Sequence, residues 1–327
     1  MFNSDYFREN TNPFLIDIEE KDFYTIEDHI KIQTKLLEHG KNIDEFMDSL
    51  YPDCGMRTSL SEMKRRCKKG LNAQIINISN PILPKIEMHK IGDGGNGKNC
   101  FVCCTPLSDD RFTASKTIID SLIEVGFNGH FLLLNGGFPN PTGKEMKYMG
   151  VPYCFKIFMI LEAKKQGFEK VIWIDAACYA VNNPDKLFEK LETSEAIFRT
   201  FPPNCFAPET YNNICFPKTI ELLNKLVNRD VRNDTTINSI VFGLNMGETH
   251  GSERINCFID EYYKMVELGL PFLTAFPEEI VFSALMNKPE YADILEKANS
   301  HNLYIHECYL NKENTKYAGY FFVQRGY

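Results

Sequence analysis

The sequence contains no long hydrophobic run. None of its segments approaches the roughly 18 to 20 consecutive apolar residues that a bilayer-spanning helix requires. The N-terminal stretch from Met1 to Asp5 also lacks the basic and then apolar order of a secretory signal peptide. We therefore expect a cytoplasmic protein without a membrane span.

A strong charge of one sign is also missing. The formal net charge is −8 over 327 residues, and the basic residues are scattered apart from a cluster between Lys64 and Lys69. A nucleic-acid-binding domain concentrates basic residues on one face, so nucleic acid is not an expected partner. Hydrophobic residues at 43% and charged residues at 24% exclude disordered and fibrous classes.

The eleven cysteines do not complete a metal site in the sequence. Cys100, Cys103 and Cys104 resemble half of a zinc site, but no second Cys or His pair follows at finger-like spacing. They lie in an apolar run, which favours buried cysteines in a strand. Because a chain of this size without an export signal has little need of disulfides, we predict reduced thiols.

Internal repeats and low-complexity tracts are absent, so one large domain with an appendage accounts for the length. Residues 1 to about 80 have helical patterns, with a capping-box-like start at Thr25 and a second segment from Ser59 to Gly70. Gly and Pro are frequent from Pro81 to Asn99, as in a connector. We predict an N-terminal helical extension and connector over residues 1–98 and a second domain over residues 99–327.

The segment from Gly92 to Asn99 matches most of a phosphate-binding P-loop, although Asn99 replaces the usual Ser or Thr. A working P-loop follows a buried strand and opens a helix, whose free N–H groups complete the phosphate cradle. Here Lys98 precedes a strand-like run, and Pro84 and polar residues precede Gly92. We interpret the segment as a turn.

Beyond the connector, strand and helix patterns alternate over 100–105, 110–125, 130–135, 153–166 and 170–174. This alternation predicts an α/β fold with a mainly parallel sheet flanked by helices. Ligands bind such sheets beyond the carboxyl ends of the strands. Polar residues at these positions, Thr105 and Asp175, are therefore site candidates.

The clearest candidate block runs from Lys156 through a helix that ends at Gly167, then through the apolar strand up to Ile174, to Asp175. An acid at a strand tip can accept hydrogen bonds from a ribose or bind a metal that bridges two phosphates. A structural turn aspartate explains the same pattern equally well.

This block resembles the donor strand of the GT-A glycosyltransferases, and the resemblance covers about residues 100 to 312. It implies a GT-A, Rossmann-like fold in which Asp175 contacts a sugar-nucleotide. Lys156, at the start of the preceding helix, and Ala177 are further candidates for the donor-binding site. The second acid of the family's DxD motif, its principal metal ligand, corresponds here to Ala177. We therefore expect weak or absent metal dependence, with any Mn²⁺ or Mg²⁺ held by Asp175 and His306.

Other segments are similar to the retaining branch that includes glycogenin and bacterial lipopolysaccharide galactosyltransferases. The run from Ile237 to Met246 resembles a family strand, which implies sugar or acceptor contacts for Asn238 and Asn245, although Ile240 replaces a glycine. A buried strand with two turn-capping asparagines is the alternative.

Two later segments carry the remaining candidates. Glu278 and Glu279 correspond to a family segment near the transferred sugar, where they could orient it or act as a base, although acids also simply cap helix starts. His306 and Lys312 keep the family spacing of a metal ligand and a diphosphate-binding lysine, while Tyr309 replaces a glycine between them. A core histidine is the alternative for His306.

The resemblance implies a glycosyltransferase that moves a sugar from a UDP- or GDP-sugar to a hydroxyl of a glycan, lipid or protein. A non-catalytic nucleotide-sugar-binding protein of the same fold is the alternative. Retention of configuration requires no strong base, whereas inversion would use Glu278 or Glu279. Loops such as Arg199–Ile214 are expected to contact the acceptor.

Overall fold

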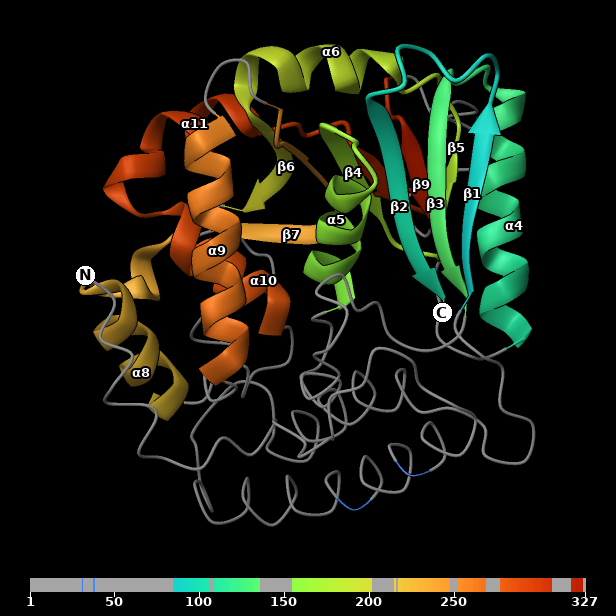
Figure 1. The fold of residues 1–327 in the computed structure, drawn as a ribbon. Helices are drawn as coiled ribbons and strands as arrows, with labels where there is room; N and C mark the ends of the chain where they lie inside the picture. The colour runs from blue at the N-terminus through green and yellow to red at the C-terminus, as the bar shows by residue number, and fades with distance from the viewer. Residues whose placement is uncertain are drawn as a thin grey trace.

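The computed structural model describes residues 31, 38, 85–105, 109–135, 155–201, 215, 217–247, 252–268, 277–307 and 319–325 (Figure 1). The N-terminal helices expected near Thr25 and Ser59 lie outside this range, apart from Lys31 and Glu38, which are helical. Within the described ranges, no helix has both the length and the apolar character needed to cross a bilayer.

A six-stranded sheet with the order β1-β3-β2-β4-β7-β6 forms the centre of the fold. Its strands are β1 (Lys85–Ile91), β2 (Asn99–Thr105), β3 (Gly129–Asn135), β4 (Lys170–Ile174), β6 (Ala196–Phe201) and β7 (Thr236–Asn245). β2 pairs in parallel with β3 and β4, while β1 is antiparallel to β3 and β7 is antiparallel to both β4 and β6. β2, β3, β4 and β6 therefore run in one direction and β1 and β7 in the other, and the predicted α/β fold with a sheet flanked by helices is confirmed.

Helices and a second sheet cover the two faces of the main sheet (Figure 1). One face packs against α5 (Phe155–Lys165), α8 (Pro217–Val227), α9 (Ser252–Leu268), α10 (Pro277–Met286) and α11 (Ala292–Ala298). The other face packs against α4 (Asp109–Glu124), α6 (Asp185–Ser194) and a three-stranded sheet of β5 (Cys178–Ala180), β9 (Phe322–Gln324) and β8 (Tyr304–His306). Two short 3₁₀ helices, η2 (Val231–Asn233) and η4 (Pro289–Tyr291), complete the described elements.

Burial on both faces explains the continuous apolar sequence of β2. Cys100 and Val102 face the α5 side, whereas Phe101 and Cys103 face the α4 side. A strand that is covered on both faces needs no polar alternation. The cysteines of this strand are buried free thiols, and burial raises the pKa of the Cys103 thiol well above its usual value.

The segment expected to be a connector contributes a strand to the main sheet. Lys85–Ile91 forms β1 and pairs along its whole length with β3, so a strand lies within the segment predicted as a connector. The turn that follows contains Gly92, Gly94, Gly95 and Gly97, all with positive φ, a conformation that glycine adopts without steric cost. It leads into β2 rather than into a helix, as the rejection of a P-loop predicted. The division at residue 98 stays a prediction.

Candidate functional site

Four elements bring polar side chains to one edge of the main sheet. β2 and β4 are parallel neighbours. Thr105 is the last residue of β2 and Asp175 directly follows β4, so both lie at the same edge of the sheet. β7 runs in the opposite direction and carries Asn238 and Ser239 in its first half, next to this edge. α10 begins nearby, and the carboxylate of Glu279 contacts Ser239. This is the edge at which open α/β sheets bind ligands.

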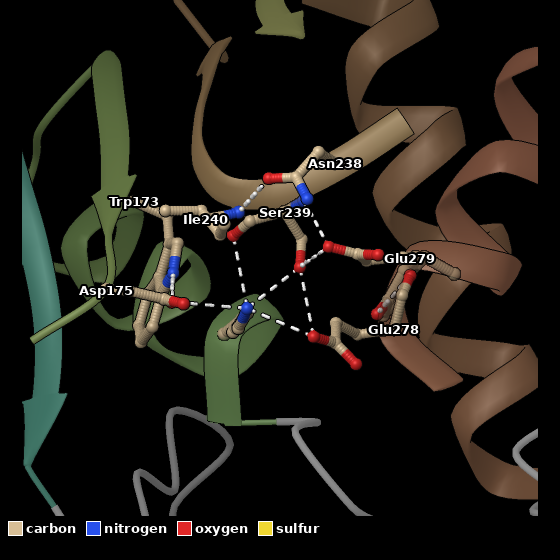
Figure 2. Close-up of polar contacts among 9 residues, drawn as sticks. Trp173, Asp175, Asn238, Ser239, Ile240, Glu278 and Glu279 are labelled. Carbon is tan, nitrogen blue, oxygen red and sulfur yellow. Dashed lines mark hydrogen bonds and ion pairs between the residues drawn. The ribbon is translucent and has the colours of Figure 1, made fainter. Parts of the chain in front are cut away.

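Asp175 is fixed through one carboxylate oxygen. The indole Nε1 of Trp173 donates a hydrogen bond of 2.7 Å to Asp175 Oδ1 (Figure 2). The ammonium of Lys156 lies 3.2 Å from the same oxygen. The other oxygen, Oδ2, has no partner among the described residues, and 27% of the side chain is exposed. Asp175 therefore presents an oriented carboxylate oxygen at the sheet edge.

Lys156 is a buried part of this arrangement rather than an exposed cation. Its Nζ lies 3.1 Å from Ser239 O, 2.8 Å from Ser239 Oγ and 3.1 Å from Glu278 Oε1. An ammonium has only three N–H groups, and with Asp175 these are already shared among four oxygens. Burial by itself would lower the pKa of Lys156, but the carboxylates of Asp175, Glu278 and Glu279 raise it above its usual value. These contacts hold the ammonium of Lys156 beside Asp175 and position the Asp175 carboxylate, and a role of Lys156 in donor binding stays a prediction.

Glu278 and Glu279 converge on Ser239 at the start of α10. Ser239 Oγ lies 3.0 Å from Glu278 Oε1 and 3.3 Å from Glu279 Oε1, and the amide of Ser239 donates to Glu279 Oε1 at 2.9 Å (Figure 2). Both glutamates are buried. Glu278 Oε2 is also buried and has no hydrogen-bond partner among the described residues. Both carboxylates therefore hold the β7–α10 junction, and their role as a base stays a prediction.

A small cavity separates Glu278 from the apolar core. It has a volume of about 10 Å³ and is lined by Lys156, Ile157, Ser239, Phe242, Leu244, Phe258, Tyr262, Glu278 and Phe282. That volume is close to the minimum that one water molecule needs. The cavity is therefore too small for a sugar or a nucleotide.

Asn238, Thr105 and Ala177 are all buried at this edge. Asn238 Oδ1 accepts a hydrogen bond of 3.0 Å from the amide of Ile240, a local backbone contact of the kind that turn-capping asparagines make. Thr105 Oγ1 lies 3.5 Å from the carbonyl of Leu134, and the carbonyl of Ala177 accepts from the amide of Arg325. These residues shape the edge beside Asp175, and their roles in donor binding or catalysis stay predictions.

Asn245 lies at the opposite edge of the sheet. It pairs in register with Lys170, the first residue of β4, and its side chain donates to Leu191 O at 3.0 Å. Seven residues of extended strand separate it from Asn238, roughly 23 Å at about 3.3 Å per residue. The structure therefore does not bring Asn245 to the candidate site. Lys312 lies outside the described residues.

His306 occupies the second sheet and has a cationic neighbour. It ends β8, where it pairs in register with Gln324 of β9. Burial lowers the pKa of His306, and the charge of Arg199 lowers it further. A metal ion at this imidazole would be repelled by the same guanidinium.

The described residues do not fit a dedicated divalent-cation site. Asp175 offers one open carboxylate oxygen, Ala177 offers no side-chain ligand, and no group of three or more His, Cys, Asp or Glu side chains converges within the described ranges. Divalent cations in proteins are held by several oxygen or nitrogen ligands. We derive no catalytic step through a metal ion.

The sequence patterns did not point to Trp173 or Ser239, and they placed Arg199 at the start of an expected acceptor loop, whereas it lies in β6. Trp173 lies two residues before Asp175, so its side chain is on the same face of β4, which the alternation of a strand could have indicated. Ser239 and Arg199 carried no such signal, because their contacts join segments that are 83 and 105 residues apart.

Comparisons with known proteins give no family assignment. No protein-family model matches the chain, and no curated protein matches its sequence. Among solved structures, the chain is similar to one described as a "crystal structure of a glycosyltransferase involved in the glycosylation of the major capsid of PBCV-1", with 14% identity and a TM-score of 0.35. The match covers 69% of this chain and 92% of that one. A likeness of this degree carries no argument about activity.

Proposed function

We propose that this protein is a glycosyltransferase that moves a sugar from a UDP- or GDP-sugar to a hydroxyl group of a glycan, lipid or protein acceptor. The observation that carries the proposal is Asp175, which stands at the carboxyl edge of the sheet with Oδ1 fixed and Oδ2 unpartnered among the described residues. A fixed carboxylate of this kind can accept hydrogen bonds from the hydroxyl groups of a ribose or a sugar.

The neighbouring residues would hold the carboxylate of Asp175 in place. Lys156 supplies a compensating positive charge, while Trp173 restricts rotation of the carboxylate by a hydrogen bond. Ser239 and Glu278 in turn hold the ammonium of Lys156. Such preorganisation means that little reorganisation is needed when the donor binds.

Transfer requires the bond between the anomeric carbon and the diphosphate oxygen to break, with its electron pair leaving on the diphosphate. The acceptor oxygen bonds to the anomeric carbon, and its proton passes to the leaving phosphate. This route, in which the leaving phosphate takes the proton, corresponds to retention of configuration. An inverting route would need a carboxylate base, and Glu278 and Glu279 are buried and engaged with Ser239, so we favour the retaining route.

The test is nucleotide release from a panel of UDP- and GDP-sugars. The wild-type protein should release UDP or GDP from one donor, slowly by hydrolysis and faster with its acceptor. Asp175→Asn should reduce release by about 100-fold or more, in the range that loss of a positioned catalytic contact costs. Asp260→Asn, an exposed acid on α9, is the matched control and should leave release unchanged. Turnover by Asp175→Asn at the wild-type rate would contradict the role of Asp175.

A non-catalytic nucleotide-sugar-binding protein is the second candidate. It is favoured by Ala177, a residue without any side-chain ligand at the position of the second acid, and by the absence of an exposed base at Glu278 or Glu279. Calorimetry with the same panel separates the two functions. If the protein binds a UDP- or GDP-sugar but releases no UDP or GDP in the presence of any acceptor class, the result would support the binding protein.

A further inference from the structure

Arg199 differs in its charge pairing from most arginines whose side chains the structure describes. Arg229, Arg232 and Arg254 each form an ion pair with a carboxylate. Within the described residues, Arg199 and Arg325 form none. In an acidic protein, a half-buried guanidinium without a carboxylate partner requires another explanation.

The position of Arg199 places it at the same sheet edge as Asp175. It lies on β6 opposite Asn238 of β7. Further along β7, the carbonyl of Ile240 accepts a hydrogen bond of 2.9 Å from the amide of Asp175. The two residues are therefore two strand spacings apart across the sheet and two residues apart along β7, which together give roughly 12 Å. Since Arg199 contacts Tyr304 of the second sheet, it flanks the edge on the face opposite Lys156.

The guanidinium of Arg199 is held in a fixed orientation. Its Nη1 donates to Tyr304 O at 3.2 Å, and its central carbon lies 5.1 Å from the centroid of the Tyr304 ring and 5.2 Å from that of Phe201. Stacking against two aromatic rings restricts the side chain and keeps its charge partly desolvated. A guanidinium has five N–H donors, and the remaining four have no acceptor among the described residues.

The groups around Arg199 that the structure describes add no compensating acid. The charge of Arg199 reaches His306, whose pKa it helps to lower. Gln324 pairs in register with His306, and its buried Oε1 has no hydrogen-bond partner among the described residues. A rigid guanidinium with spare donors is suited to an oxyanion, which it can bind in a bidentate manner.

We propose that Arg199 is the anion-binding residue of the site and that its ligand is the diphosphate of the nucleotide-linked donor. The identity of the ligand rests on the proposed function, whereas the oxyanion chemistry rests on the contacts of Arg199. In this arrangement Asp175 binds hydroxyl groups of the donor, and Arg199 stabilises the negative charge that grows on the leaving diphosphate. Arg199 thereby supplies positive charge at an edge where Ala177 provides no metal ligand.

The experiment compares wild-type protein with Arg199→Gln and Arg199→Lys by isothermal titration calorimetry. The ligands are inorganic phosphate, inorganic pyrophosphate, UDP, GDP, uridine and guanosine, without added metal. Arg199→Gln should weaken binding of pyrophosphate and of the favoured nucleoside diphosphate by roughly tenfold or more, as expected for loss of a charged hydrogen-bond donor. Arg199→Lys should recover part of that loss, and nucleoside affinity should stay unchanged in both variants.

Lys165→Gln is the matched control for loss of one positive charge, because this exposed lysine ends α5 just before β4 and so lies toward the opposite edge. It should bind every ligand as the wild type does. Thermal unfolding of each variant checks that the fold persists. If Arg199→Gln does not fold, Arg199→Lys, which keeps the positive charge but lacks the guanidinium, provides the comparison with wild type.

The possible results separate the inference from the proposed function. If wild type and Arg199→Gln bind nucleoside diphosphates equally, the inference is wrong while the proposed function stands. If wild type binds pyrophosphate through Arg199 but binds no nucleotide or nucleotide-sugar, the anion site stands and the proposed function fails. Binding of phosphate as tight as that of pyrophosphate and UDP would overturn the assignment to a diphosphate. If the wild type binds no oxyanion at all, the inference is wrong.

Discussion

The ammonium of Lys156 lies 3.2 Å from Asp175 Oδ1, and both groups belong to a network that is mostly buried. The same ammonium lies 3.1 Å from Glu278 Oε1. A buried ion pair of this kind adds little stability relative to an apolar core, but removal of one partner leaves uncompensated charge. The network therefore fixes the geometry at the edge more than it strengthens the fold.

Replacement of Lys156 by methionine should destabilise the protein by about 3 kcal/mol or more, because Glu278 and Asp175 would lose the ammonium that compensates them. Urea unfolding measures the effect. The double variant Lys156→Met with Glu278→Gln should recover part of the loss, since the two sites are coupled. Lys165→Met, an exposed lysine on the same helix, is the control. Equal unfolding free energies for wild type and Lys156→Met would contradict the importance of this pairing.

Ala177→Asp recreates the missing acid, but the residue is buried. We expect this substitution to lower the melting temperature, since an added carboxylate would lose its hydration. Ala176→Asp, at a half-buried neighbouring position, should cost less. A thermal-shift measurement with and without Mn²⁺ checks the outcome. If Mn²⁺ restores the melting temperature of Ala177→Asp but not that of Ala176→Asp, this edge retains a latent metal site. That result would contradict the conclusion that the described residues do not fit a divalent-cation site.

Lys98→Ala should leave binding of nucleotides and nucleotide-sugars unchanged. Lys98 pairs with Glu169 on the surface and leads into β2, so it has no phosphate-cradling helix beside it. Loss of an exposed pair costs at most about 1 kcal/mol. Calorimetry with the donor and with ATP measures the effect, and weaker binding to Lys98→Ala would return the P-loop interpretation to consideration.

Gly243→Ala should destabilise the centre of the sheet. A Cβ at this position of β7 would lie 2.9 Å from side-chain carbons of both Ile172 and Ile197 and 3.1 Å from Leu191. Overpacking of this kind costs about 1 to 3 kcal/mol. Gly167→Ala is a useful contrast, because that residue has open space around it but a positive φ of 92°. Denaturant unfolding measures the cost of the close contacts at Gly243 and of the positive φ at Gly167 separately, one variant at a time. An unchanged unfolding midpoint for Gly243→Ala would contradict the close packing around this residue.

The sequence indicated the order of most described elements because hydrophobic periodicity and helix-ending residues are local. The strand expected over 170–174 coincides with β4, and Asp175 follows it as expected. β1 escaped detection because it is a short edge strand with Ile86 and Met88 exposed, within a segment rich in Gly and Pro. Its pairing with β3 joins residues that are 38 (Ile91 and Gly129) to 50 (Lys85 and Asn135) positions apart in the chain, which no local pattern reports.

The sequence by itself determined that Asp175 stands at the end of a buried strand in an α/β fold. Only the tertiary structure decided which side chains meet it. Asn238 and Asn245 are equivalent candidates in the sequence, yet a ten-residue strand carries them to opposite edges of the sheet. Lys156, Ser239 and Glu278 come together because antiparallel β7 lies beside β4 and α10 packs against it. Strand direction and neighbour order follow from the packing of the whole core, and these long-range contacts are not encoded in the local periodicity of the chain.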